Sequence, residues 1–190
     1  GTDALTAAGA LALHVDGIGT DVVHLAGQMR IVRYPPDPGM PGTVPIEIVS
    51  LNLSGFSPLF GPVQVTTRPG APQVGSINMP LPNETPADSF FDVFFQVELP
   101  GLGRSLVQMS PFHIEARTGP IPFFDVFTET FSQQADLADV PTGMRAGALT
   151  HVALDPRPEV DILAAMAQAS WTIGRTSEIV QMNGPAVVVR

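Results

Sequence analysis

The chain has 190 residues, 14% charged side chains and a formal net charge of −9, with 20 prolines, 18 glycines and no cysteine. All nine basic residues are arginine, and the absence of lysine excludes a Walker-type phosphate loop and Schiff-base catalysis. The acidic balance argues against a nucleic-acid partner, because Lys and Arg must neutralise the phosphates, and the lack of cysteine excludes a disulfide scaffold or a thiol enzyme.

The first part of the chain predicts strands separated by proline and glycine. Residues 4–13 are rich in alanine and also fit a helix, which Gly9 would interrupt. Residues 21–33 alternate apolar and polar side chains, which is typical of a strand with one buried face. Three prolines between residues 34 and 39 then end the pairing, because proline donates no ladder hydrogen bond.

Further apolar segments continue the strand pattern. The predicted strands are residues 44–53, 63–67, 73–79, 90–99, 105–109, 112–117, 123–131 and 145–154. Within residues 90–99, the face that begins at Phe91 is wholly apolar and is predicted to be core. The opposite face places Phe90 and Phe94 among polar residues, so these two rings are either half-buried or part of a contact patch.

The C-terminal part contains the one segment that favours a helix. Between residues 158 and 171, apolar residues recur at helical spacing after Pro158, and Gly174 would end the helix. Beyond it, Asn183 and Gly184 separate two strand-like segments, residues 178–182 and 186–189. An Asn-Gly pair in this position predicts a β-hairpin turn.

These elements predict an all-β fold, mainly an antiparallel β-sandwich, with one short helix near residues 158–171. The length fits a single β-rich domain over residues 1–190, and an arrangement of two β units would divide near residues 132–144. No apolar segment reaches the length of a membrane-spanning helix, so membrane insertion is not expected.

Residues 86–95 read Pro-Ala-Asp-Ser-Phe-Phe-Asp-Val-Phe-Phe. This segment resembles one found in uncharacterised bacterial secreted β-rich proteins, some of which carry a C-terminal surface-sorting tail. The resemblance covers about a tenth of the chain and includes no known catalytic residue. It implies an extracellular or cell-surface location, with the cytoplasm as the alternative.

The acidic residues near the two Phe-Phe-Asp-Val-Phe segments are the candidate metal ligands. Asp88, Asp92 and Asp125 could supply carboxylate oxygens to Ca²⁺, although no EF-hand loop is present and no other cofactor is expected. A pair of such carboxylates is also the chemistry of glycoside hydrolysis. The four histidines lack metal-site spacing, and His113 and Glu115 share a strand face that is interpreted as solvent-exposed.

Two sequence triplets match the N-glycosylation pattern. They begin at Asn52 and Asn83, and the second is followed directly by Pro86. Proline in that position lowers the use of the second triplet. Both matter only if a glycosylating cell exports the protein.

No catalytic signature emerges, so the chain is predicted not to be an enzyme. The leading hypothesis is an extracytoplasmic structural or assembly protein, a homo-oligomer or a matrix or surface partner that associates through strand edges or apolar patches. Its candidate assembly contacts are Leu11, Leu13, Val15, Phe90, Phe94, Val187 and Val189. The alternative is a β-sandwich module that binds carbohydrate or another small ligand, and a hydrolase with paired carboxylates is the third interpretation.

Overall fold

The computed structural model describes residues 1–36, 38–78, 87–118, 126–128, 134–158, 160–173 and 176–189. Residues 87, 117, 118 and 158 and the last two ranges are described by their backbone alone. The chain forms two compact units, Gly1–Pro158 and Glu159–Arg190. Nearly all described residues lie in antiparallel strands, so the predicted all-β class is confirmed.

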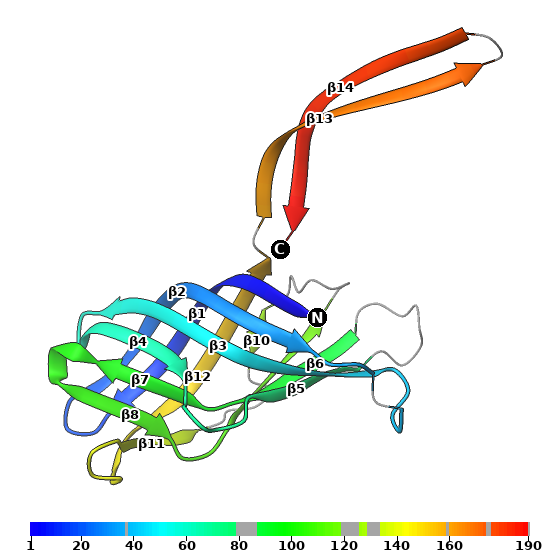
Figure 1. Cartoon of the computed structure of the whole chain (residues 1–190). Coiled ribbons are helices and arrows are strands. Elements are labelled where there is room, and N and C mark those ends of the chain that lie inside the picture. The colour runs from blue at the N-terminus through cyan, green and yellow to red at the C-terminus, as the bar shows by residue number, and fades with distance from the viewer. Residues whose placement is uncertain are drawn as a thin grey trace. The chain divides into compact units, whose positions relative to one another are not determined.

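The first unit is one continuous antiparallel sheet (Figure 1). A 3₁₀ turn, Pro100–Leu102, joins two of its strands. The strands are β1 (Thr2–Val15), β2 (Gly19–Arg33), β3 (Thr43–Ser57), β4 (Gly61–Thr67), β5 (Val74–Asn78), β6 (Ala87–Val93), β7 (Phe95–Leu99), β8 (Arg104–Gln108), β9 (Phe112–Thr118), β10 (Phe127–Thr128), β11 (Ala135–Asp139) and β12 (Arg145–Pro158).

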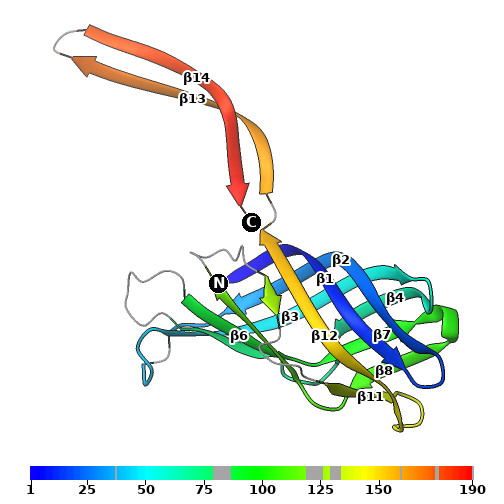
Figure 2. The ribbon, with the colours of Figure 1, turned by 180° about the vertical axis from the view of Figure 1, so that it is seen from behind.

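This sheet closes on itself because β1 pairs with β2 along one edge and with β12 along the other. The predicted sandwich is therefore a single sheet whose walls face each other across one core. Strand β3 lies in the near wall in Figure 1, and β12 lies in the near wall when the molecule is turned by 180° (Figure 2). Strand β11, which lies within the predicted unit boundary at residues 132–144, belongs to this sheet and pairs with both β8 and β12.

The part of the sheet between β3 and β12 is interrupted at one level. Strands β4 and β5 both pair antiparallel with β3, β4 with its second half and β5 with its first half, and residues 68–73 connect them. The same holds for β6 and β7, for β8 and β9, and for β10 and β11. The sheet here has two branches, β4–β7–β8–β11 and β5–β6–β9–β10.

Buried glutamines satisfy the backbone where the two branches separate. The side-chain oxygen of Gln73 accepts a hydrogen bond from the amide of Phe94 at 2.6 Å. The side-chain oxygen of Gln108 accepts from the next amide, that of Phe95, at 2.5 Å. Both glutamines are at least 97% buried. Their side-chain oxygens therefore pair backbone amides that would otherwise need water as a partner. The predicted strand 90–99 is therefore two strands that break at Phe94.

The core fills the space between the two walls with inward-facing apolar side chains. The predicted core face of residues 90–99 is confirmed, because every member from Phe91 to Leu99 is at most 1% exposed. The rings of Phe91 and Phe127 pack with their centroids 5.2 Å apart. Aromatic burial of this kind contributes strongly to stability. The largest fully buried side chains are Phe60, Phe91, Phe95, Phe112 and Phe127.

Both helical interpretations of the sequence are wrong. Residues 4–13 lie in β1, and the leucines of this strand occupy core positions on its inward face. The segment near residues 158–171 lies in β12 and in β13 (Val160–Ile173), which pairs over its whole length with β14 (Thr176–Val189). The apolar residues of β13 fit both the spacing of a helix and the alternation of a strand. The pairing with the 14-residue strand β14 shows that the segment is a strand.

The predicted Asn183–Gly184 turn is also wrong. These two residues lie inside β14, opposite Met166 and Ala165, and the connection between the strands falls at residues 174–175. Strands β13 and β14 form a separate two-stranded sheet that makes up the described part of the second unit.

Candidate ligand-binding site

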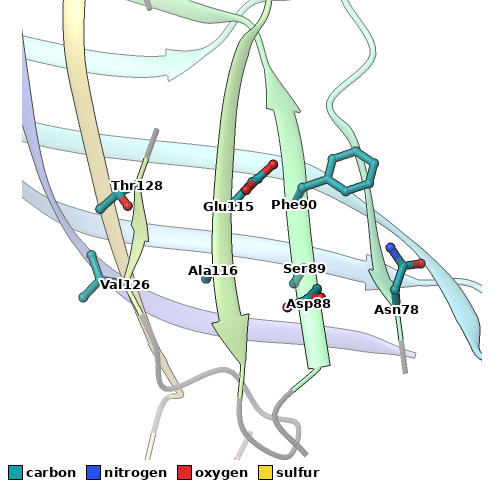
Figure 3. Close-up of a pocket in the computed structure, with 8 residues that line it drawn as sticks. All are labelled: Asn78, Asp88, Ser89, Phe90, Glu115, Ala116, Val126 and Thr128. Carbon is teal, nitrogen blue, oxygen red and sulfur yellow. The ribbon is translucent and has the colours of Figure 1, made fainter. Parts of the chain in front are cut away.

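A pocket of about 560 Å³ lies where β5, β6, β9 and β10 are paired or adjoin one another. Asn78, the last residue of β5, stands opposite Asp88, and Ser89 stands opposite Ala116. Figure 3 shows the side chains of four neighbouring chain segments around this strand-end pocket. Its described lining is Asn78, Asp88, Ser89, Phe90, Glu115, Ala116, Val126 and Thr128. Its volume lies in the usual range for small-molecule sites.

Ser89 is the most unusual member of this lining. It occupies the inward face of β6, two residues before Phe91, and is only 3% exposed. Its hydroxyl oxygen has no hydrogen-bond partner in the described part of the chain. A buried hydroxyl without a partner costs about 1–3 kcal/mol, so this group in a residue of the pocket lining calls for an explanation.

The rest of the lining mixes polar, acidic and apolar side chains. Thr128 of β10 stands opposite Glu115 of β9, and the two residues are exposed on the outer face of the sheet. Asp88 is exposed beside them. Phe90 and Val126 supply apolar surface. The pocket therefore combines hydrogen-bond acceptors with an aromatic ring.

A carboxylate–imidazole–carboxylate cluster adjoins the pocket through Glu115. The Nδ1 atom of His113 lies 2.7 Å from a carboxylate oxygen of Asp92, and its Nε2 atom lies 2.9 Å from Glu115. Burial lowers the pKa of His113, but the hydrogen bonds and charges of the two carboxylates outweigh it, so the pKa is raised above 6.5. The ring of Phe90 packs against the imidazole with centroids 5.1 Å apart.

Two of the three candidate Ca²⁺ ligands, Asp88 and Asp92, lie in different surroundings. Asp88 and Asp92 lie on the same face of β6, but Asp92 is hydrogen-bonded to His113 while Asp88 lines the strand-end pocket. Asp125 lies outside the described residues. Within the described part of the chain, no group of three or more metal-ligating side chains is placed to hold a metal ion.

Three of the predicted assembly contacts are wrong. Leu11, Leu13 and Val15 are at most 2% exposed and belong to the core. Strand β1, which carries them, is paired on both edges. The apolar residues of this segment are those of a strand that closes its own sheet.

The remaining predicted contacts lie in different surroundings. Phe90 and Phe94 are half-buried, the first against His113 and the second at the break between β6 and β7. Val187 and Val189 lie in β14, in register with residues 162 and 160 of β13.

The predicted glycosylation sites are placed as follows. Asn52 is exposed in the middle of β3, between Gln28 of β2 and Thr66 of β4. Asn83 lies outside the described residues.

Sequence reasoning missed the pocket, and it gave Ser89 no role and Glu115 no place in a site. His113 and Glu115 were expected to share a strand face, and they do, but the solvent-exposed interpretation is incomplete because Asp92 joins them from β6. The available signal was the alternation of both segments, which places His113 and Asp92 on outward faces. Their pairing depends on the register of β6 with β9.

A second groove of about 580 Å³ lies on β7, β8 and β11, with Arg68 and Met109 among its lining residues. The buried amide of Gln108 also has an unpaired Nε2 atom, but its oxygen bonds to the Phe95 amide inside the core. Gln108 is among the residues that line this groove, so it too carries a buried, unpaired polar atom. Among the described residues, no helix is long and apolar enough to span a membrane.

The fold and the pocket define a closed antiparallel β protein with a small-molecule-sized site at its strand ends. Residues 1–123 match a family described as a family of unknown function, DUF6073, and the chain belongs to that family. Among curated protein sequences, none matches this chain.

A solved structure has a similar fold. It is that of DynF from the dynemicin biosynthesis pathway of Micromonospora chersina. The two chains are 22% identical, the similarity covers 83% of this chain and 80% of DynF, and the TM-score is 0.71. This likeness establishes a shared fold.

Proposed function

We propose that the chain binds a small organic ligand in the strand-end pocket. The observation that carries this proposal is Ser89, whose buried hydroxyl faces no partner at the wall of a pocket of about 560 Å³. A ligand that hydrogen-bonds to this hydroxyl would remove the cost of burying it unpaired. This proposal takes up the small-ligand alternative drawn from the sequence.

The shared fold with DynF supports the same proposal. DynF comes from the dynemicin biosynthesis pathway. The similarity spans most of both chains. The net charge of −9 is consistent with it, since it argues against nucleic acid as the bound partner.

The pocket can be tested by filling it. The full chain is screened by thermal shift and native mass spectrometry against a library of amines, polyols, aromatic compounds and carboxylic acids. Ala116→Leu adds three carbons at the pocket wall, whereas Ala26→Leu adds them at an exposed position of β2 outside the pocket lining. We expect compounds that bind the wild type and the A26L variant but not the A116L variant. Binding that survives in A116L, or no binding by any compound, would refute the proposal.

A second candidate function, self-assembly, is favoured by the β13–β14 hairpin. A two-stranded sheet is marginally stable on its own in water, so a hairpin of two 14-residue strands gains from an added strand. Strand β14 contains Pro185, which protects an edge, whereas β13 contains no proline and one charged residue, Asp161. The edge of β13 is the one we expect a second copy of the chain to pair with.

Light scattering after size-exclusion chromatography tests self-assembly. Ala167→Lys places a charge in the middle of β13, and Ala26→Lys places the same charge on β2. Self-assembly through β13 predicts a concentration-dependent oligomer that A167K dissociates and A26K retains. A wild-type chain that stays monomeric at high concentration would contradict it. Export to the cell surface belongs to this second candidate, and fractionation of the producing cells would test it.

A further inference from the structure

We propose that the second groove, on β7, β8 and β11, binds the carboxylate of a small organic acid with an apolar body, and that Arg68 receives this carboxylate. The groove shares no described lining residue with the strand-end pocket, so the inference goes beyond the proposed function. It combines the hydrogen bonding of Arg68 with the apolar lining of a groove of about 580 Å³.

The groove lies on the outer face of three neighbouring strands (Figure 1). Three of its lining residues stand opposite one another in the registers of β7, β8 and β11: Gln96, Val107 and Ala138. The residues that alternate with them along the strands are fully buried: Val97, Leu106 and Leu137. Because successive side chains of a strand point to opposite faces, the lining residues face away from the core.

Arg68 follows β4 and belongs to the lining of the groove. Its Nη1 atom donates a hydrogen bond of 2.7 Å to the main-chain carbonyl of Gln108, which holds the half-buried guanidinium in place. The side chain of Gln108 is not needed for this, since it is fully buried and bonds to the Phe95 amide. Within the described part of the chain, Arg68 has no carboxylate partner, and its Nε and Nη2 atoms donate no hydrogen bond.

The Nε and Nη2 edge of Arg68 matches a carboxylate. In proteins this edge of arginine binds both oxygens of a carboxylate as a planar fork. Arg33 shows the arrangement in the same chain, because its Nε and Nη2 atoms donate to the two oxygens of Asp3 at 2.6 and 2.7 Å. A small acid bound to Arg68 would repeat this pair with a carboxylate from outside the chain.

The charge of the groove also favours an anion. The one acid in its described lining, Asp139, lies 3.7 Å from the Nε atom of Arg104, so its charge already has a partner. Glu98 of β7 lies outside the lining, and its Oε1 atom accepts a hydrogen bond of 2.6 Å from the Ser105 hydroxyl. Among the described lining residues, Arg68 therefore carries the charge that no neighbouring side chain balances.

The rest of the lining suits an apolar body. Pro69, Val107, Met109 and Val140 line the groove, and Met109 and Val140 are 59% and 49% exposed. The hydrocarbon part of a ligand would remove these side chains from water, which is favourable. An acid with several carbons gains both from this contact and from Arg68, whereas inorganic phosphate gains from the charge alone.

Three probes separate charge from apolar contact. Hexanoate, hexanol and inorganic phosphate are titrated into the full chain by calorimetry at neutral pH and low salt. We expect hexanoate to bind at least tenfold more tightly than hexanol or phosphate. Arg68→Gln should weaken hexanoate binding at least tenfold, and Arg68→Lys, which keeps the charge but loses the fork, should weaken it less. Arg30→Gln is the matched control, because Arg30 is exposed on β2 outside the groove.

A second pair of variants leaves the hydrogen bond of Arg68 intact. Met109→Glu places a negative charge in the groove at an exposed position, and Met40→Glu places the same charge at a residue that is 56% exposed between β2 and β3. We expect M109E to weaken hexanoate binding at least tenfold and M40E to retain it. This pair decides the outcome if R68Q does not fold.

The carboxylate assignment is overturned if hexanoate does not bind, if hexanol or phosphate binds as tightly, or if R68Q and R30Q have equal effects. Hexanoate held by Arg68 should bind A116L as it binds the wild type, so acids whose binding R68Q removes are not ligands of the strand-end pocket. If A116L abolishes hexanoate binding while R68Q retains it, the acid belongs to the strand-end pocket, and this inference falls while the proposed function stands.

Discussion

Two buried serines are expected to respond in opposite ways to the same substitution. Ser89 is 3% exposed and its hydroxyl is unpaired in the described part of the chain, whereas Ser57 is fully buried and its hydroxyl makes three hydrogen bonds. The Ser57 hydroxyl donates to Asp21 at 2.5 Å and accepts from the amides of Leu59 and Phe60 at 3.0 Å each. It closes the turn between β3 and β4.

The magnitudes follow from these partners. Ser89→Ala removes an unpaired buried hydroxyl and should stabilise the ligand-free protein by about 1 kcal/mol. Ser57→Ala removes three hydrogen bonds at about 1 kcal/mol each, so it should destabilise the protein by about 3 kcal/mol. For a chain of this size, 1 kcal/mol corresponds to a shift of roughly 2–4 °C in Tm.

The assay is denaturant unfolding, monitored by far-UV circular dichroism. The protein is first unfolded and refolded to remove bound compounds. Calorimetry with the ligands found for the pocket then follows on the same samples. We expect S89A to raise the unfolding midpoint and to weaken ligand binding, and S57A to lower the midpoint. If S89A destabilises the ligand-free protein as strongly as S57A, the Ser89 hydroxyl is bonded in the free protein and the reasoning about the pocket is refuted.

Three further outcomes are expected. Because the pKa of His113 is raised above 6.5 in the folded chain, its contribution to stability is complete below pH 6.5 and is lost as the pH rises through the folded-state pKa. Thermal unfolding across this range checks it, and His113→Gln should remove that dependence. Gly55→Ala should cost about 3 kcal/mol or prevent folding, since a Cβ there would overlap the carbonyl oxygen of His24, as urea unfolding would show. Phe127→Ala should cost about 3–5 kcal/mol in the same assay, because it empties a fully buried site against Phe91.

The fold class could be predicted from the sequence because side chains on a strand alternate strictly. Residues 90–99 illustrate this, since the predicted core face from Phe91 to Leu99 is buried although the chain changes partners at Phe94. The break itself leaves no mark in the alternation. It depends on Gln73 and Gln108, two polar residues whose role exists only once distant strands are paired.

The candidate site was less accessible to sequence reasoning. A lone serine such as Ser89 in an apolar strand carries no local signal, because its missing partner is a property of the packed structure. The segment near residues 158–171 was misassigned because its alanines satisfy helical and strand spacing equally, and only the pairing with β14 distinguishes the two. His113 was placed on the correct face, but its two carboxylate neighbours required the strand register.

The interruption of four strands at one level has a consequence for cooperativity. The branch β5–β6–β9–β10 and the branch β4–β7–β8–β11 are hydrogen-bonded separately, and each is bordered by β3 on one side and by β12 on the other. The branch that carries the pocket can therefore unfold while the other branch stays folded, which is sub-global unfolding. Amide protons of β6 and β9 are expected to exchange as one group, faster than those of β7 and β8.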